Sequence, residues 1–224
     1  MPKTSTIKRI LIANRGEIAR RIIRTCDRLG IETVAVFSDV DADAPFVAEA
    51  SRSIMIGGPL SYLSIDAIIS AARESQADAI HPGYGFLSEN AEFAEAAHKA
   101  GIVFIGPSAT TIRALGSKTN AKALAQNAKV PTAPTLLLQE SPEALQVEAI
   151  KAFGSTVGFP IIIKAAAGGG GRGMRVLHAG SDIAADLASA RRESERSFKS
   201  AEVFVEKFIA PARHIEVQDA ADAS

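Results

Sequence analysis

The chain has 224 residues, which is enough for one or two domains that bury a hydrophobic core. Its 25 basic and 25 acidic residues give a formal net charge of zero, so no overall basic field favours nucleic acid or an anionic membrane surface. No apolar run is long enough to span a membrane, and the N-terminus is too short and polar for a signal peptide, so we expect a cytoplasmic protein. The single cysteine, Cys26, lies in an apolar helical pattern typical of a buried structural thiol.

Residues 7–106 alternate between apolar runs typical of buried strands and amphipathic runs typical of helices. Strands that alternate with helices form parallel sheets with helices on both faces. We therefore predict an α/β fold with a Rossmann-like, doubly wound parallel sheet over residues 1–107. The predicted strands are 7–13, 33–37, 53–56, a run ending at His81 and 103–106, and the predicted helices are one closed by Gly30, a short piece near Pro45, 64–74 and 90–100.

The composition changes after Pro107. Residues 108–135 are predicted to be a helical connection followed by the proline-punctuated linker VPTAPT. A smaller α+β unit is predicted over 136–208, where strands flank a glycine-rich loop and a helix precedes the strand EVFVEKF. Residues 213–218, RHIEVQ, alternate like a further strand, and a lone strand needs partners for its backbone groups. Either this strand pairs backward with an earlier part of the chain, or its partners are missing.

The segment FPIIIKAAAGGGGRGMR, residues 159–175, carries the clearest functional pattern. An apolar strand runs into Lys164, and four consecutive glycines follow after three alanines. Glycine lets successive backbone N–H groups converge on one anion, and a lysine adds a point charge for phosphate oxygens. The spacing is not that of a Walker A loop, and a flexible linker would not normally lie between two apolar strands. We interpret this segment as a nucleotide-phosphate site.

Two loops at predicted strand ends allow more than one interpretation. The turn ANRGEIA offers only Gly16 where a dinucleotide fingerprint has three glycines, so a packing role fits at least as well. The loop HPGYGFLSEN carries Tyr84 and Glu89, and it fits a structural turn as well as a ligand contact.

Charged residues near the glycine-rich segment have similar alternatives. Lys118 could be a second cation for the phosphates or a solvated helix lysine. Glu206 and Lys207 could hydrogen-bond a nucleotide or form an ordinary exposed pair, and His214 could contact a ligand or lie on a surface strand. No His, Asp or Glu cluster in the sequence has metal-ligand spacing, and no Ser–His–Asp pattern is present.

Taken together, these motifs resemble those of biotin carboxylase, the ATP-grasp subunit or module of biotin-dependent carboxylases. The matching segments are IANRGEIARRIIR, AIHPGYGFLSEN, FIGPSATTIRALGSK, FPIIIKAAAGGGGRGMRV, VEKFI and RHIEVQ. The resemblance implies that 136–208 is the ATP-grasp lid and that 209–224 are the start of a truncated C-terminal ATP-grasp domain. It also implies that Tyr84 and Glu89 lie in the cleft for biotin and bicarbonate. The nucleotide contacts that it implies are Lys118, Lys164, Gly168, Gly169, Gly170, Gly171, Met174, Glu206, Lys207, Ile209 and His214.

The implied reaction is the ATP- and bicarbonate-dependent carboxylation of biotin on a carrier protein, through carboxyphosphate. The implied cofactors are ATP and Mg²⁺, with biotin as the carried substrate. The implied partners are the biotin carboxyl carrier, a carboxyltransferase and a second copy of the full-length protein. Lysines and a glycine lid suit this chemistry because phosphoryl transfer depends on positioning and charge stabilisation.

The chain departs from the family pattern at Ala167, where a fifth glycine is common, and in the tail DAADAS. The family's Mg²⁺ ligands and main catalytic residues are expected beyond Ser224, so the resemblance implies an incomplete and inactive N-terminal half. One alternative is a non-catalytic short form that assembles with full-length subunits through the arginine-rich helix after Gly16, whose arginines equally fit a solvated face. Another ATP-grasp ligase is a third possibility, against which HPGYGFLSEN and ANRGEIA argue.

Overall fold

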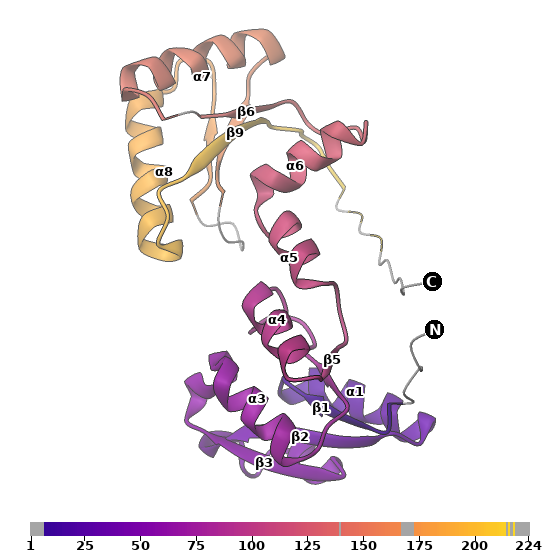
Figure 1. Ribbon diagram of the computed structural model, residues 1–224. Coiled ribbons are helices and arrows are strands. Elements are labelled where there is room, and N and C mark those ends of the chain that lie inside the picture. Colours follow the sequence, from indigo (N-terminus) through magenta and orange to yellow (C-terminus); the bar gives the residue numbers. More distant parts are fainter. Residues whose placement is uncertain (1–6, 139, 167–172, 214, 216, 218–224) are drawn as a thin grey trace. The chain divides into compact units, whose positions relative to one another are not determined.

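The structure, a computed structural model, describes residues 7–138, 140–166, 173–213, 215 and 217. The chain divides into two compact units, Met1–Gly116 and Ser117–Ser224. Each unit has its own sheet (Figure 1). Each also has its own hydrophobic core. The boundaries inferred from the sequence, at residues 107 and 135, stay a prediction.

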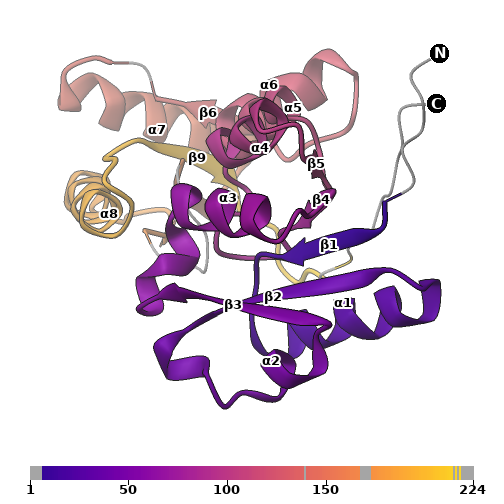
Figure 2. The ribbon, with the colours of Figure 1, turned by 60° about the horizontal axis from the view of Figure 1, so that its bottom comes forward.

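A five-stranded parallel sheet organises the first unit (Figure 2). Its strand order, β3-β2-β1-β4-β5, reverses direction between β1 and β4, as in doubly wound sheets. This confirms the predicted parallel α/β architecture. The strands are β1 (Arg9–Ile12), β2 (Glu32–Ser38), β3 (Arg52–Gly57), β4 (Ala79–His81) and β5 (Val103–Phe104).

Helices cover both faces of this sheet. The first or last residues of several helices are capped by side-chain or backbone hydrogen bonds. Gly30 follows α1 with a left-handed φ of 68°, and its N–H donates to the carbonyl of Asp27, as the sequence predicted for a C-cap. Ser64 and Asn90 begin α3 and α4 by accepting a backbone N–H on their side-chain oxygens. The helices are α1 (Gly16–Leu29), α2 (Pro45–Glu49), α3 (Ile65–Glu74), α4 (Ala91–Lys99) and α5 (Ala109–Gly116).

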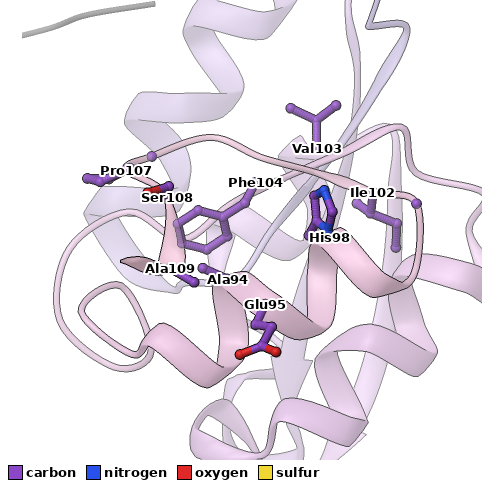
Figure 3. Close-up of a pocket in the computed structure, with 11 residues that line it drawn as sticks. Ala94, Glu95, His98, Ile102, Val103, Phe104, Pro107, Ser108 and Ala109 are labelled. Atoms are coloured by element: carbon purple, nitrogen blue, oxygen red, sulfur yellow. The ribbon is translucent and has the colours of Figure 1, made fainter. Parts of the chain in front are cut away.

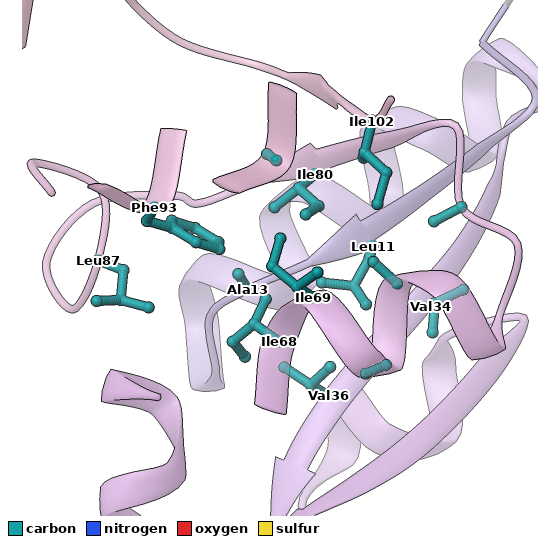
Figure 4. Close-up of a cluster of buried hydrophobic side chains, with 14 of the residues drawn as sticks. Leu11, Ala13, Val34, Val36, Ile68, Ile69, Ile80, Leu87, Phe93 and Ile102 are labelled. Atoms are coloured by element: carbon teal, nitrogen blue, oxygen red, sulfur yellow. The ribbon is translucent and has the colours of Figure 1, made fainter. Parts of the chain in front are cut away.

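Apolar residues pack on both faces of the parallel sheet because successive side chains of a strand point to opposite sides. Leu11 of β1 belongs to the cluster formed with α3 and α4, which Figure 4 shows, whereas Ile10 and Ile12 pack with α1. Cys26 lies buried in the α1 cluster, and burial raises the pKa of its thiol. This agrees with a structural role for the cysteine.

A four-stranded antiparallel sheet, in the order β6-β9-β7-β8, organises the second unit. One face carries an apolar cluster in which Ile161 and Ile163 pack with residues of α7 and α8. The elements are α6 (Lys118–Asn127), β6 (Thr135–Leu137), α7 (Glu143–Val157), β7 (Ile161–Ala165), β8 (Arg175–Leu177), α8 (Ile183–Phe198) and β9 (Val203–Lys207). This confirms the predicted α+β region after the parallel domain.

The strand predicted at 213–218 is wrong for the part that the structure describes. Arg213, Ile215 and Val217 lie outside any strand, and the side chains of Ile215 and Val217 are exposed. Alternation of polar and apolar residues is not sufficient for a strand, since a strand also needs a neighbour for its backbone groups. Among the described residues, no helix is long and apolar enough to cross a membrane.

Candidate functional site

The strand predicted before the glycine-rich segment is β7, and Lys164 is its last residue but one. Ile161 and Ile163 point into the core shared with α7 and α8, so alternation places Ile162 and Lys164 on the opposite face of the sheet. On that face the ammonium group of Lys164 forms an ion pair with the carboxylate of Glu206 on the neighbouring strand β9. The structure thus joins two residues that the sequence analysis named separately.

Glu206 is the buried centre of this arrangement. Glu206 is 6% exposed, and it lies opposite Ile162 of β7 and Thr135 of β6 in the sheet register. Its carboxylate accepts hydrogen bonds from Lys164 and from Lys122. Burial alone would raise the pKa of Glu206, but these two hydrogen bonds and the two positive charges hold the pKa below its usual value. The carboxyl group is therefore ionised at neutral pH.

Lys122 is a residue of this site that the sequence analysis missed. It lies on α6, one turn after Lys118, and residues four apart share one face of a helix. The only signal in the sequence was this spacing of two lysines. Lys118 itself is the exposed first residue of α6, whose N-cap Ser117 accepts the backbone N–H of Asn120.

The remaining candidates of the second unit have different environments. Lys207 points away from Glu206, and its ammonium group donates to the carbonyl oxygens of Gly158 at 2.8 Å and Pro160 at 3.4 Å. Met174 and Ile209 are 39% and 59% exposed, so both offer apolar surface to solvent. The other candidates lie outside the described residues: Gly168, Gly169, Gly170, Gly171 and His214.

In the first unit, the buried side chain of Asn14, just after β1, holds the loop after β4 in place through hydrogen bonds. Its amide nitrogen donates to the carbonyl oxygens of Pro82 at 2.8 Å and Tyr84 at 2.9 Å. Gly83 lies between these carbonyls with a φ of 64°, and a Cβ atom there would lie 2.7 Å from the amide nitrogen of Asn14. The side chain of Tyr84 is outside this contact and donates to Glu17. Glu89 is exposed on the same loop.

A second buried carboxylate, Asp41, lies beyond the end of β2. It accepts hydrogen bonds from Tyr62 at 2.7 Å and Ser38 at 3.0 Å and forms an ion pair with Arg15. The hydrogen bond from Arg15 is the largest cause that lowers the pKa of Asp41 to about 2. Burial, followed by the bond to Asp41, raises the pKa of Tyr62 to about 12. This network fixes Arg15, the residue before α1.

A pocket of about 640 Å³ lies beside α4 and β5 (Figure 3). Its walls are largely apolar, and Glu95 at its rim is engaged by Lys99 and Arg113. The pocket contains none of the candidate residues named from the sequence. Among the described residues, no group of three or more His, Cys, Asp or Glu side chains is placed to hold a metal ion. The paired lysines around Glu206 are therefore the stronger candidate site for a phosphorylated ligand.

Two families of known proteins match the chain, and their matches meet near the boundary between its two compact units. Residues 6–112 match the family described as biotin carboxylase, N-terminal domain. Residues 117–224 match the family described as carbamoyl-phosphate synthase L chain, ATP binding domain. Over 219 residues the chain is 45% identical to a biotin carboxylase of Haemophilus influenzae, an alignment that covers 96% of this chain and 48% of that protein.

Solved structures show the same likeness. A biotin carboxylase–beta-gamma-ATP complex from Campylobacter jejuni has a TM-score of 0.84 and 44% identity, with 91% of this chain and 46% of that chain covered. The biotin carboxylase domain dimer of the Hydrogenobacter thermophilus 2-oxoglutarate carboxylase, in complex with MgADP, ADP and bicarbonate, has a TM-score of 0.83 and 40% identity, with 92% and 45% covered. The chain spans about half the length of these relatives. It belongs to the biotin carboxylase family, of which it carries the N-terminal domain and an ATP-binding region.

Proposed function

We propose that this chain provides the nucleotide-binding part of a biotin carboxylase, a ligase that uses ATP and bicarbonate to carboxylate biotin on a carrier protein. The main support is the ion pair between Lys164, at the end of the strand that leads into the glycine-rich segment, and the buried Glu206. A lysine held at a strand end beside a run of glycines suits phosphate binding. Of the two relatives that share this fold, one was solved with MgADP, ADP and bicarbonate and the other as a beta-gamma-ATP complex.

In this proposal the residues of the second unit bind and orient ATP. Lys164 and Lys118 supply positive charge to the phosphates, with the backbone N–H groups of Gly168, Gly169, Gly170 and Gly171. Met174 and Ile209 supply exposed apolar surface for the base. Glu206, Lys207 and His214 are the remaining proposed contacts to the nucleotide. Bound Mg²⁺ would neutralise phosphate charge. Its ligands are expected in the C-terminal domain of the family, which follows these residues in sequence.

The proposed chemistry proceeds in two steps. A bicarbonate oxygen attacks the γ-phosphorus of ATP, which releases ADP and forms carboxyphosphate. Carboxyphosphate then releases CO₂ and phosphate, and the deprotonated ureido nitrogen of biotin captures the CO₂. Tyr84 and Glu89 are proposed to border the cleft for biotin and bicarbonate. The proposed partners are the biotin carboxyl carrier, a carboxyltransferase and a second copy of the full-length protein, and the proposed location is the cytoplasm.

Replacing Lys164 tests this proposal in the protein at its natural length. The variant Lys164→Met removes the positive charge but keeps much of the side chain's volume. Because a hydrogen bond to a charged group contributes roughly 1.5–3 kcal/mol, we expect the affinity for MgADP to fall by about 10- to 100-fold in isothermal titration calorimetry. Lys151→Met, which breaks an exposed ion pair with Glu148, is the matched control and should bind normally.

Two results would contradict the proposed function. One is an unchanged affinity for MgADP in Lys164→Met, which would remove Lys164 from the nucleotide site. The other is an absence of bicarbonate-dependent ATP hydrolysis in the unaltered natural-length protein, which would exclude biotin carboxylase activity even if nucleotide binds.

A further inference from the structure

We propose that Lys122 is a positioning residue that keeps Glu206 ionised and in place when nucleotide phosphates draw Lys164 away from it. This inference rests on the proposed role of Lys164 in nucleotide binding. In the structure, both lysines neutralise one buried carboxylate. A phosphate that accepts a hydrogen bond from Lys164 competes with Glu206 for its positive charge and so weakens that ion pair.

The two lysines bind different oxygens of the Glu206 carboxylate and differ in their exposure to solvent. Lys122 binds Oε1 of Glu206, whereas Lys164 binds Oε2. The side chain of Lys122 is 20% exposed and that of Lys164 is 32% exposed. The more exposed lysine can therefore leave its oxygen while the more buried one retains the other.

Lys122 and Lys164 are the charged side chains that face Glu206 among the described residues. Lys122 comes from α6 and Lys164 from β7, whereas β6 places the neutral Thr135 opposite Glu206. On β9 itself, Lys207 is turned toward the carbonyl oxygens of residues 158 and 160. If Lys122 were absent, the departure of Lys164 would therefore leave a buried carboxylate without a counter-ion from the part of the chain that the structure describes.

A buried carboxylate without a counter-ion is costly, and its usual response is to bind a proton. With Lys122 present, Glu206 keeps one positive partner, so nucleotide can bind without protonation of this group. Without Lys122, nucleotide binding would be coupled to uptake of a proton by Glu206. Because that proton becomes harder to obtain as pH rises, the affinity should then fall with increasing pH.

The test compares MgADP binding by the natural-length protein and its Lys122→Met variant between pH 6 and 8. Titration calorimetry in buffers of different ionisation enthalpy gives the number of protons taken up per nucleotide. We expect the variant to take up as much as about one more proton than the unaltered protein, with its affinity falling by up to about tenfold per pH unit. Lys122→Gln should behave in the same way, since it also removes the charge, whereas Lys122→Arg should restore the original behaviour.

The outcomes separate this role from a merely structural one. If Lys122→Met and Lys122→Gln bind more weakly but show no added proton uptake and no added pH dependence, Lys122 only supports the local fold and the inference is wrong. Normal binding by both variants also overturns it. If the unaltered protein itself does not bind MgADP, the proposed function fails, and the inference fails with it. Lys151→Met again serves as the control for loss of an exposed lysine.

Discussion

Asp41 illustrates how a single buried side chain can make the stability of the first unit depend on pH. It is 4% exposed and is held ionised by hydrogen bonds from Arg15, Tyr62 and Ser38. Its pKa is lowered from 3.8 to about 2, so the native state favours the charged form more than the unfolded state does. The resulting stabilisation is fully present above the unfolded pKa and is lost as the pH falls from about 4 to about 2.

The variant Asp41→Asn should remove this contribution. We expect the free energy of unfolding at pH 7 to fall by about 1–3 kcal/mol, because Arg15, Tyr62 and Ser38 lose a charged acceptor. The variant should also lose less stability than the original protein when the pH is lowered from 7 to 3. Urea denaturation at the two pH values measures both effects. Asp43→Asn, at an exposed position two residues later, is the control, and an equal loss in both variants would contradict the argument.

The residues of the candidate site were predictable from the sequence to different degrees. Lys164 could be found because it lies near the end of an apolar strand before a run of glycines, which is a local pattern. Lys122 could not be found in this way, since its partner Glu206 is 84 positions away and a solvated helix lysine has the same local pattern. The sequence allowed an exposed pair between Glu206 and Lys207, but the structure shows that each is bound to other groups.

At the scale of elements, the loop after β4 has a fixed shape because it packs directly on the end of β1. Gly83 has a left-handed φ and lies against the side chains of Asn14 and Ile18. The amide of Asn14 cannot move aside without losing its hydrogen bonds to the loop carbonyls. Gly85 also has a left-handed φ, of 73°, but no atom lies within 4 Å of a Cβ placed there. A side chain at residue 85 would therefore meet only backbone strain, whereas a side chain at residue 83 would meet both backbone strain and a steric clash.

Alanine substitution at the two positions tests this distinction. A left-handed conformation costs an L-residue roughly 1–2 kcal/mol, so we expect Gly85→Ala to lower the free energy of unfolding by about that amount. Gly83→Ala should cost about 1–3 kcal/mol more, because the methyl group overlaps Asn14 and Ile18. Urea denaturation of both variants measures the difference. Equal losses would show that the loop adjusts freely around residue 83.

Local patterns predicted the existence of these elements better than their limits. The strand expected over 7–13 is β1 (Arg9–Ile12), and the strand expected over 103–106 is the two-residue β5. In both cases the apolar run extends past the assigned strand, although Ala13 and Ile105 still donate a backbone hydrogen bond to β4. The prediction at 213–218 failed on the described residues for a related reason, since a strand is defined by its partners and a sequence pattern does not name them.

At the scale of the whole molecule, each unit is stabilised by a core of its own. The first unit buries residues such as Leu11 and Ile80 between its parallel sheet and its helices, as Figure 4 shows. The second unit buries Ile161, Ile163 and Leu187 between its antiparallel sheet and two helices. The parallel order of the first sheet followed from the strand–helix alternation, because crossover connections leave few other topologies.

We expect residues 1–116 alone to unfold in one cooperative transition in urea, since this unit has a complete sheet and core. Within it, Ile80→Ala should lower the free energy of unfolding by about 2–5 kcal/mol, because Ile80 is fully buried and the substitution leaves a cavity. Val103→Ala on the adjacent strand β5 is the control, and it should cost under about 1 kcal/mol because Val103 is 46% exposed. A gradual transition, or equal losses in the two variants, would contradict an independent core.

The wide separation of the site residues along the chain also sets the order in which they can come together during synthesis. Lys164 and Glu206 are 42 positions apart, and Lys122 and Glu206 are 84 apart. Domains generally fold as units, the N-terminal one first, as the ribosome extends the chain. The first unit can therefore close as soon as its last helix has emerged, whereas neither lysine meets its carboxylate until β9 has been made. The ion pairs around Glu206 would thus form later than the contacts within the first unit.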